Sequence, residues 1–197
     1  MARRSTRSTS DHGDWAVPYQ PAYIADLDPH TADQHVAIPR PPLEAAVQRI
    51  VETEGPIHRQ VFERHLDELL YRSGRRTRWE EGTLGQLVEE GRLTDTDGFL
   101  DIPGRPCAYA RRPLPGLTKR PVEHVAPAER QRALLGLIED QPRRLSAEKV
   151  VTAAARFFGW SPTAGRASAR LMADLYQLRD TGAVTGWPDK LEPGAGR

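Results

Sequence analysis

An arginine-rich segment of this sequence contains the residue type best suited to bind phosphate groups. It contains Arg72, Arg75, Arg76 and Arg78. Guanidinium groups form paired, charge-assisted hydrogen bonds with phosphate oxygens. The segment also precedes a predicted helix, whose free N–H groups attract anions. This spacing predicts contacts with a nucleic-acid backbone rather than the reading of base edges.

The glutamates of that predicted helix support a different interpretation of the same arginines. They are Glu80, Glu81, Glu89 and Glu90. On a helix that enters a DNA groove, these carboxylates would repel the phosphates. The arginines would then pair with the glutamates on a solvated surface. The residue types alone leave both interpretations open.

A second set of cations lies on a later predicted helix. Arg166 and Arg170 share one face of that helix with Gln177, and the first acid after them is Asp174. Further cations lie near the preceding turn: Arg143, Arg144 and Lys149. This face is a slightly better nucleic-acid candidate than the first. The alternative is that its cations serve only solubility.

Two histidines and a glutamate are the residues most suggestive of a metal site. His58 lies at a predicted helix start, and His65 follows almost two turns later, with Glu54 before them. Helical histidines that share a metal usually lie one turn apart, on the same face. We therefore expect a helix-capping and a partly buried histidine, and no metal.

No catalytic constellation is found in the sequence. Cys107 has no evident base partner and is expected to be a packed thiol. A phosphate-binding Walker A loop is absent, and Trp160 and Trp187 are expected to be core or lid residues rather than stacking platforms. The sequence predicts no enzyme, no cofactor and no small-molecule substrate.

The composition limits the classes of protein further. The chain has 197 residues, 38% hydrophobic and 28% charged, which suits one or two small domains. Its net charge is +1, so binding of a polyanion depends on local patches. The single cysteine excludes an intrachain disulfide, and no apolar stretch approaches the ~20 residues of a membrane helix. Met1–Ser10 is typical of a basic tail rather than a signal, so we expect a cytoplasmic protein.

Residues 43–112 follow the element order of a winged-helix unit. Leu43, Val47, Ile50 and Val51 form one helical stripe, which Gly55-Pro56 ends. A second helix is expected from near Arg59, and a third over residues 80–90 with Gly91 as its C-cap. Strands over residues 92–94 and 99–102 flank the predicted turn Asp95-Thr96-Asp97-Gly98. This acidic tip predicts a poor minor-groove clamp.

A second winged-helix-like unit is predicted over residues 127–187, after a linker over residues 113–126. Its helices run from Pro127 towards Pro142, from the N-cap Ser146 to Phe158, and from Gly165 to Thr181. A short strand over residues 183–187 follows, and residues 188–197 are expected to be a disordered tail. The expected fold class is mainly α with a short β-hairpin (α+β), with two tandem winged-helix-like units.

Residues 1–42 are expected to form an extended, partly disordered N-terminal arm. The arm is rich in proline and polar residues but contains apolar anchors, among them Trp15, Tyr19, Tyr23 and Leu27. These anchors dock either on the chain's own domain or on a partner protein. The sequence leaves both alternatives open.

Four short stretches resemble a known family. They are Ile50-Val51-x-x-Glu54-Gly55-Pro56-Ile57-His58, Gly74-Arg75-Arg76, Val125-Ala126-Pro127-x-Glu129 and Arg156-Phe157-Phe158-Gly159-Trp160. They are similar to the domain of unknown function at the C-terminus of large bacterial superfamily 1 helicases that contain a Vsr-like endonuclease domain. The resemblance covers roughly residues 43–186. It implies an association with nucleic-acid enzymes, some of them in phage defence, but it transfers no site residues.

The sequence thus predicts a non-catalytic, DNA-associated protein. It would be a freestanding copy of that domain, acting beside a helicase or nuclease, and it would contact DNA without sequence preference. The alternative is a protein–protein interaction module or adapter on the same scaffold.

Overall fold

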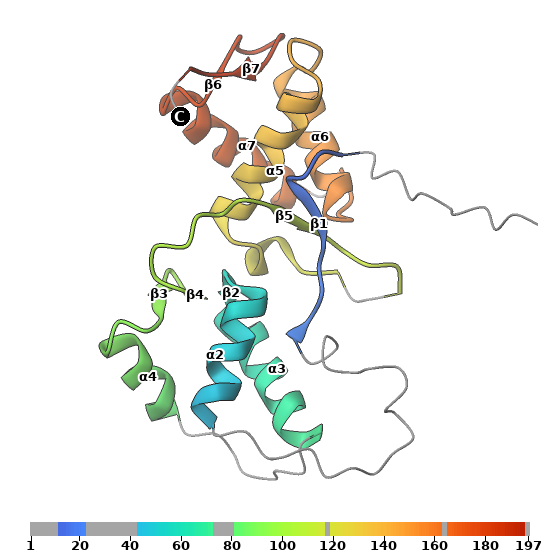
Figure 1. Cartoon of the computed structure of the whole chain (residues 1–197). Coiled ribbons are helices and arrows are strands. Elements are labelled where there is room, and N and C mark those ends of the chain that lie inside the picture. Colours follow the sequence, from blue (N-terminus) through green and yellow to red (C-terminus); the bar gives the residue numbers. More distant parts are fainter. Residues whose placement is uncertain (1–11, 23–42, 73–80, 117–118, 163–164, 196–197) are drawn as a thin grey trace, which may run out of the picture. The chain divides into compact units, whose positions relative to one another are not determined.

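The computed structural model describes residues 12–22, 43–72, 81–116, 119–162 and 165–195, without the side chains of residues 69–72 and 81. These residues form six α-helices and several short paired strands (Figure 1). The expected α+β class, with helices predominating, is therefore confirmed. No described helix is long and apolar enough to cross a membrane.

Two compact units divide the chain, and each combines segments that are distant in sequence. The α2–α4 unit contains residues 18–107 and 113–129, and the α5–α7 unit contains residues 1–17, 108–112 and 130–197. Residues 108–112 belong to the same unit as residues 1–17 because of a strand pair. β1 (Ala16–Pro18) pairs with β5 (Ala110–Arg112), and the Ala110 amide donates to the Trp15 carbonyl at 2.7 Å. From the sequence, residues 108–112 were expected in the preceding unit and residues 1–17 in a separate arm.

The helices of the α2–α4 unit follow the predicted apolar pattern. They are α2 (Leu43–Glu54), α3 (Arg59–Arg72) and α4 (Glu81–Glu89). As predicted, α2 ends directly before Gly55-Pro56, because Pro56 has no N–H and restricts Gly55. After α4, Gly91 takes a positive φ of 69° as predicted, which lets the Arg92 amide bond back to the Leu87 carbonyl at 2.9 Å.

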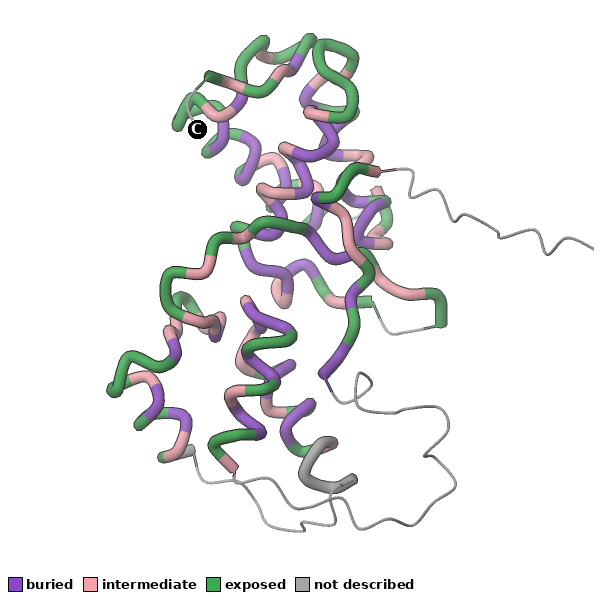
Figure 2. The backbone as a smooth tube through the Cα atoms, in the orientation of Figure 1, coloured by how far each residue is buried: buried purple, intermediate pink, exposed green. Residues whose placement is uncertain are grey.

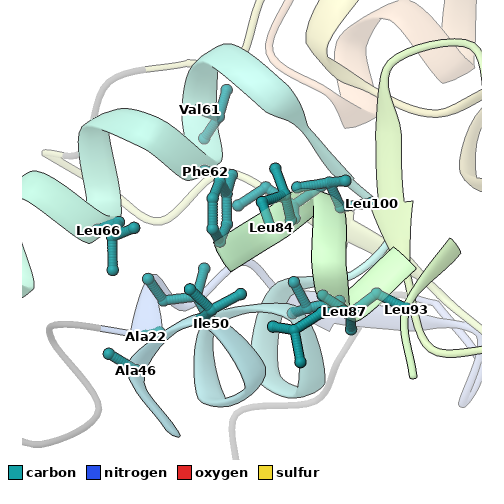
Figure 3. Packing of buried hydrophobic residues seen from close by; sticks show 13 residues of the cluster. Ala22, Ala46, Ile50, Val61, Phe62, Leu66, Leu84, Leu87, Leu93 and Leu100 are labelled. Carbon is teal, nitrogen blue, oxygen red and sulfur yellow. The ribbon is translucent and has the colours of Figure 1, made fainter. Parts of the chain in front are cut away.

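Apolar side chains from all three helices and the adjoining strands form one core. Figure 3 shows Phe62 and Leu66 of α3 facing residues of α2 and α4, with Leu93 and Leu100 contributed by the strand region. Ala22, from the segment that follows β1, joins this cluster at 1% exposure. Such burial supplies most of the stability of a small domain.

A three-stranded antiparallel sheet closes one side of this core. β2 (Ile57–His58), β3 (Thr94–Thr96) and β4 (Phe99–Asp101) are arranged in the order β2-β4-β3. The predicted four-residue turn is wrong, because Thr96 already pairs with Phe99. The loop is the two-residue Asp97-Gly98, both with positive φ, which matches the twist of a tight hairpin.

The α5–α7 unit has three helices at the predicted places. They are α5 (Pro127–Asp140), α6 (Ala147–Phe157) and α7 (Gly165–Asp180). The predicted N-cap Ser146 accepts from the Lys149 amide at 3.4 Å. In Figure 2, buried and exposed positions alternate along these helices, and the predicted inward leucines of α7 are all buried.

A strand pair after α7 overturns the predicted disordered tail. β6 (Val184–Thr185) pairs antiparallel with β7 (Glu192–Pro193). Leu191 is fully buried, and its amide donates to the Leu145 carbonyl at 3.0 Å. A single leucine in a Pro/Gly-rich end gave too short a pattern to indicate this strand.

The described part of residues 113–126, expected to be a linker, includes buried apolar side chains. A 3₁₀ turn, η1 (Val122–His124), lies within this segment. Val122, Val125 and Ala126 are buried. The proline and glycine content concealed these three apolar contacts.

Candidate nucleic-acid interface

Helix α7 has one exposed face that is basic and contains small residues. Its buried face consists of Ala167, Leu171, Asp174, Leu175 and Leu178. At 100° per residue, the opposite face carries the exposed residues Arg166, Ala169, Arg170, Ala173, Tyr176 and Gln177. The two alanines have short side chains, so a ligand can approach the helix backbone closely between the cations. We call these six residues the α7 face.

The carboxylate nearest to this face in sequence does not reach the surface. Asp174 is 4% exposed and pairs with Arg130 of α5, with Nε–Oδ2 at 2.5 Å and Nη2–Oδ1 at 3.1 Å. Its charge is therefore neutralised inside the unit. No acidic side chain of α7 is exposed before Asp180, which lies on the same side of the helix at its C-terminal end and pairs with Arg179.

The C-terminal end of α7 carries an aromatic and cationic cluster. The rings of Tyr176 and Trp187 lie 5.2 Å apart at 42°. The Arg179 guanidinium lies over both, 4.9 Å from the Tyr176 ring and 5.2 Å from the Trp187 ring. Tyr176 is 42% exposed. Trp187 follows β6, so the strand pair and the helix build this cluster together.

The sequence did not reveal this cluster, since Trp187 was expected to be a core or lid residue. The phase of the α7 leucines was sufficient to place Tyr176 and Arg179 outside the core. Their approach to Trp187 depends on the turn after α7, where Gly182 takes a φ of 74°. Local patterns do not encode such a contact.

A shallow pocket of about 310 Å³ also opens at the end of α7. It is lined by Gln131, Gln177, Leu178, Asp180 and Thr181. Gln131 donates to Gln177 at 2.8 Å, and the Thr181 hydroxyl donates to the Gln177 carbonyl at 3.0 Å. The side chains of Gln131 and Thr181 therefore both hydrogen-bond to Gln177 in the wall of the pocket.

The corresponding helix of the α2–α4 unit has a different surface. Gly82, Gly85, Gln86 and Glu89 of α4 are exposed, and Glu90 follows them. Nearby cations pair with acids: Arg92 lies 3.3 Å from Glu44 and 3.5 Å from Glu90. Arg59 donates to Asp95 of the hairpin at 2.6 Å. This surface presents little unbalanced positive charge.

The first arginine set falls at the edge of the described structure. Arg72 is the last residue of α3, and its side chain is not described. Arg75, Arg76 and Arg78 lie outside the described residues. By contrast, Arg166 and Arg170 are both described and exposed on α7.

Two of the four N-terminal anchors are covered by the chain itself. Trp15 is 4% exposed, donates from Nε1 to Asp140 at 3.1 Å and lies 5.1 Å from the Phe157 ring. Tyr19 is 7% exposed. Neither ring is available to a partner in this fold. Tyr23 and Leu27 lie outside the described residues.

The carboxylate of Glu54 organises a buried polar network in the α2–α4 unit. It accepts from the Tyr19 hydroxyl, from the Ala22 amide at 2.8 Å and from His65 Nδ1 at 2.9 Å. Glu54 and His65 are 1% and 5% exposed. Each donor satisfies a charge that would be costly if buried alone. The network attaches residues 19–22 to α2 and α3.

A pair of stacked histidines lies in the same unit. As expected of a helix-capping histidine, His58 accepts from the Gln60 amide at 3.3 Å. Its ring stacks on His124 at 4.4 Å. Burial lowers the pKa of His58, while Glu63 and Asp95 oppose the shift. Burial and the neighbouring His58 lower the pKa of His124.

The described residues form no cluster of metal-ligating side chains. Among them, no group of three His, Cys, Asp or Glu side chains is arranged to hold a metal ion. Cys107 is half-buried.

No protein-family model matches the chain, and comparisons with curated proteins and with solved structures likewise give no match.

Proposed function

We propose that this chain is a non-catalytic DNA-binding protein built from two winged-helix-like units, and that the α7 face is its principal contact. The element order α2-β2-α3-α4-β3-β4, with sheet order β2-β4-β3, supports the first unit. The order α5-α6-α7-β6-β7 supports a shorter second one. In this plan the third helix faces the DNA groove. The third helices here are α4 and α7.

The burial of Asp174 is the observation that favours α7 over α4. It withdraws the only acid of α7 before Asp180 from the surface that carries Arg166 and Arg170, and the alanines allow close approach of a phosphate backbone. On α4 the exposed Glu89 opposes such an approach. Contacts made by arginine to phosphates carry affinity without sequence preference. Binding is therefore expected to be weak, salt-sensitive and sequence-nonspecific.

The same proposal extends to the biological setting. The family resemblance of residues 43–186 favours an accessory of a helicase or nuclease in DNA processing or phage defence. A DNA-bound role of this kind belongs to the cytoplasm of a bacterial cell.

Fluorescence anisotropy with labelled DNA at ~50 mM and ~200 mM salt tests the proposed function. The double variant Arg166→Ala/Arg170→Ala is expected to lose most of the affinity. Its matched control is Arg156→Ala/Lys190→Ala, which removes the same charge from exposed positions of the same unit outside the candidate patch. Equal losses of DNA affinity in both variants would show that the effect depends on net charge and not on the position of the arginines. Salt-independent binding, or none, would overturn the proposal.

The acidic surface of α4 favours a second candidate function, an adapter that docks a basic protein. Gly82 and Gly85 have open space where a side chain would lie, so the helix is flat beside Glu89. A photo-crosslinking side chain at position 85 tests this directly, with position 169 on α7 as its control. A protein captured from position 85 alone supports the adapter. Capture from both positions, or from neither, argues against it.

A further inference from the structure

We propose that Tyr176, Arg179 and Trp187 form a stacking platform for an unpaired base, so that the α7 face prefers single-stranded to duplex DNA. This inference rests on the proposed function and assigns its substrate class. We call these three residues the stacking platform.

Contacts among its own side chains hold the platform together without a ligand. Arg179 contacts both rings and also pairs with Asp180, with Nη2–Oδ1 at 2.6 Å and Nε–Oδ1 at 2.9 Å. Two aromatic rings and a guanidinium plane are thus held together at the end of one helix. Because these contacts restrain the three side chains, less side-chain entropy is lost when a base binds.

The exposure of Tyr176 is the step that points to a ligand. Tyr176 is 42% exposed, and its ring lies 5.2 Å from the Trp187 ring at an angle of 42°. Every nucleobase has a flat face that stacks on such a ring, and arginine adds a cation–π contribution. The platform therefore suits any base, without hydrogen bonds that distinguish them.

The platform continues the cationic face of the same helix. From Arg166 to Tyr176 the helix rises about 15 Å, and Arg170 lies between them. Ala169 and Ala173 lie on the exposed side between the arginines and the ring. A strand that lays its phosphates along Arg166 and Arg170 reaches the platform with its next bases. One helix thus supplies both kinds of contact that single-strand binding uses.

The preference for single-stranded over duplex DNA follows from the exposed position of the Tyr176 ring. In a duplex, both faces of each internal base are covered by its neighbours, so an exposed ring has nothing to stack on except the terminal pair. An unpaired strand offers base faces along its whole length. Cations alone do not make this distinction, because both kinds of strand carry phosphates.

A comparison of two labelled probes tests the inference on the full chain: an oligothymidine of about 15 nucleotides and a duplex of about 15 base pairs. Tyr176→Ala is expected to weaken oligothymidine binding roughly 10-fold and to leave duplex binding nearly unchanged. Tyr176→Phe keeps the ring and is expected to bind like the wild type. Tyr109→Ala, at an exposed tyrosine before β5, is the control for removal of a surface aromatic ring.

The outcomes separate this inference from the proposed function. Loss of affinity for both probes in Arg166→Ala/Arg170→Ala, with no effect of Tyr176→Ala, overturns the platform and keeps the DNA-binding proposal. Equal weakening of both probes by Tyr176→Ala overturns the strand preference. Weakening by Tyr176→Phe as strong as by Tyr176→Ala assigns the effect to the hydroxyl and overturns stacking. A wild type that binds neither probe overturns both proposals.

Discussion

Arg130 and Asp174 form a buried ion pair between α5 and α7, with both side chains only 5% exposed. The pair has two hydrogen bonds, at 2.5 and 3.1 Å. Such geometry compensates the cost of burying each charge, whereas a single remaining charge would have no compensation. The pair also determines the charge of the α7 face, because it withdraws a carboxylate from the surface.

Replacing one partner of this pair is therefore expected to destabilise the α5–α7 unit strongly. Asp174→Ala should lower the free energy of unfolding by about 3–5 kcal/mol, because it leaves the Arg130 guanidinium buried without its carboxylate. Urea denaturation of the full chain measures the loss. The double variant Arg130→Met/Asp174→Leu is expected to be closer to the wild type than either single variant. If the double variant loses as much unfolding free energy as the two single variants together, Arg130 and Asp174 do not stabilise the fold through their interaction.

Two helical glycines are expected to respond in opposite directions to alanine. A Cβ at Gly136 of α5 would lie 2.1 Å from Cδ2 of Trp15, whereas a Cβ at Gly85 of α4 meets nothing within 4 Å. Gly136→Ala should displace the buried indole and cost about 1–3 kcal/mol. Gly85→Ala should stabilise by about 0.5–1 kcal/mol, since alanine is the better helix former.

Thermal unfolding of both glycine variants checks this difference in sign. A Gly136→Ala protein as stable as the wild type would show that Trp15 packs elsewhere. A destabilised Gly85→Ala would show that α4 does not present this position to solvent.

The stacked histidines predict a loss of stability in mild acid. The pKa values of His58 and His124 are lowered below 6.5 in the folded chain, chiefly by burial. As the pH falls through 6.5, the two histidines become protonated in the unfolded chain but stay neutral in the folded chain, whose pKa values are lower. The stability that is present above pH 6.5 is therefore lost progressively until the pH reaches the folded pKa values. Melting temperatures between about pH 7.5 and pH 5 should therefore fall, and His124→Gln should reduce the fall. An identical fall in both proteins would assign the acid sensitivity to other groups.

The sequence predicted the local elements of this fold well because they depend on local patterns. The leucines of α7, the N-cap Ser146 and the Gly55-Pro56 break each act within a few residues, and all lie where expected. The missed features depend on partners distant in sequence. Trp15 is buried by Gly136 and Phe157, and β1 needs β5.

The candidate site shows the same division between local features, which the sequence predicted, and contacts between distant residues, which it did not. The phase of α7 was sufficient to identify Arg166 and Arg170 as one face. It did not show that Asp174 is neutralised, because Arg130 lies on another helix. Trp187 joins Tyr176 only after the chain has turned at Gly182. The charge and the aromatic character of the candidate interface therefore depend on tertiary contacts.

The two arginine sets of the chain give a last prediction, because only one can be the main phosphate contact. Removing one arginine–phosphate interaction reduces the slope of log affinity against log salt by about 0.9 for duplex DNA. Arg166→Ala/Arg170→Ala should therefore reduce the slope by roughly 2. The triple variant Arg75→Ala/Arg76→Ala/Arg78→Ala removes more charge but is expected to change the slope less, since glutamates follow these arginines in sequence. Titrations of one duplex at several salt concentrations measure both slopes. A larger change of slope in the triple variant would assign the main phosphate contact to the segment before α4 instead of α7.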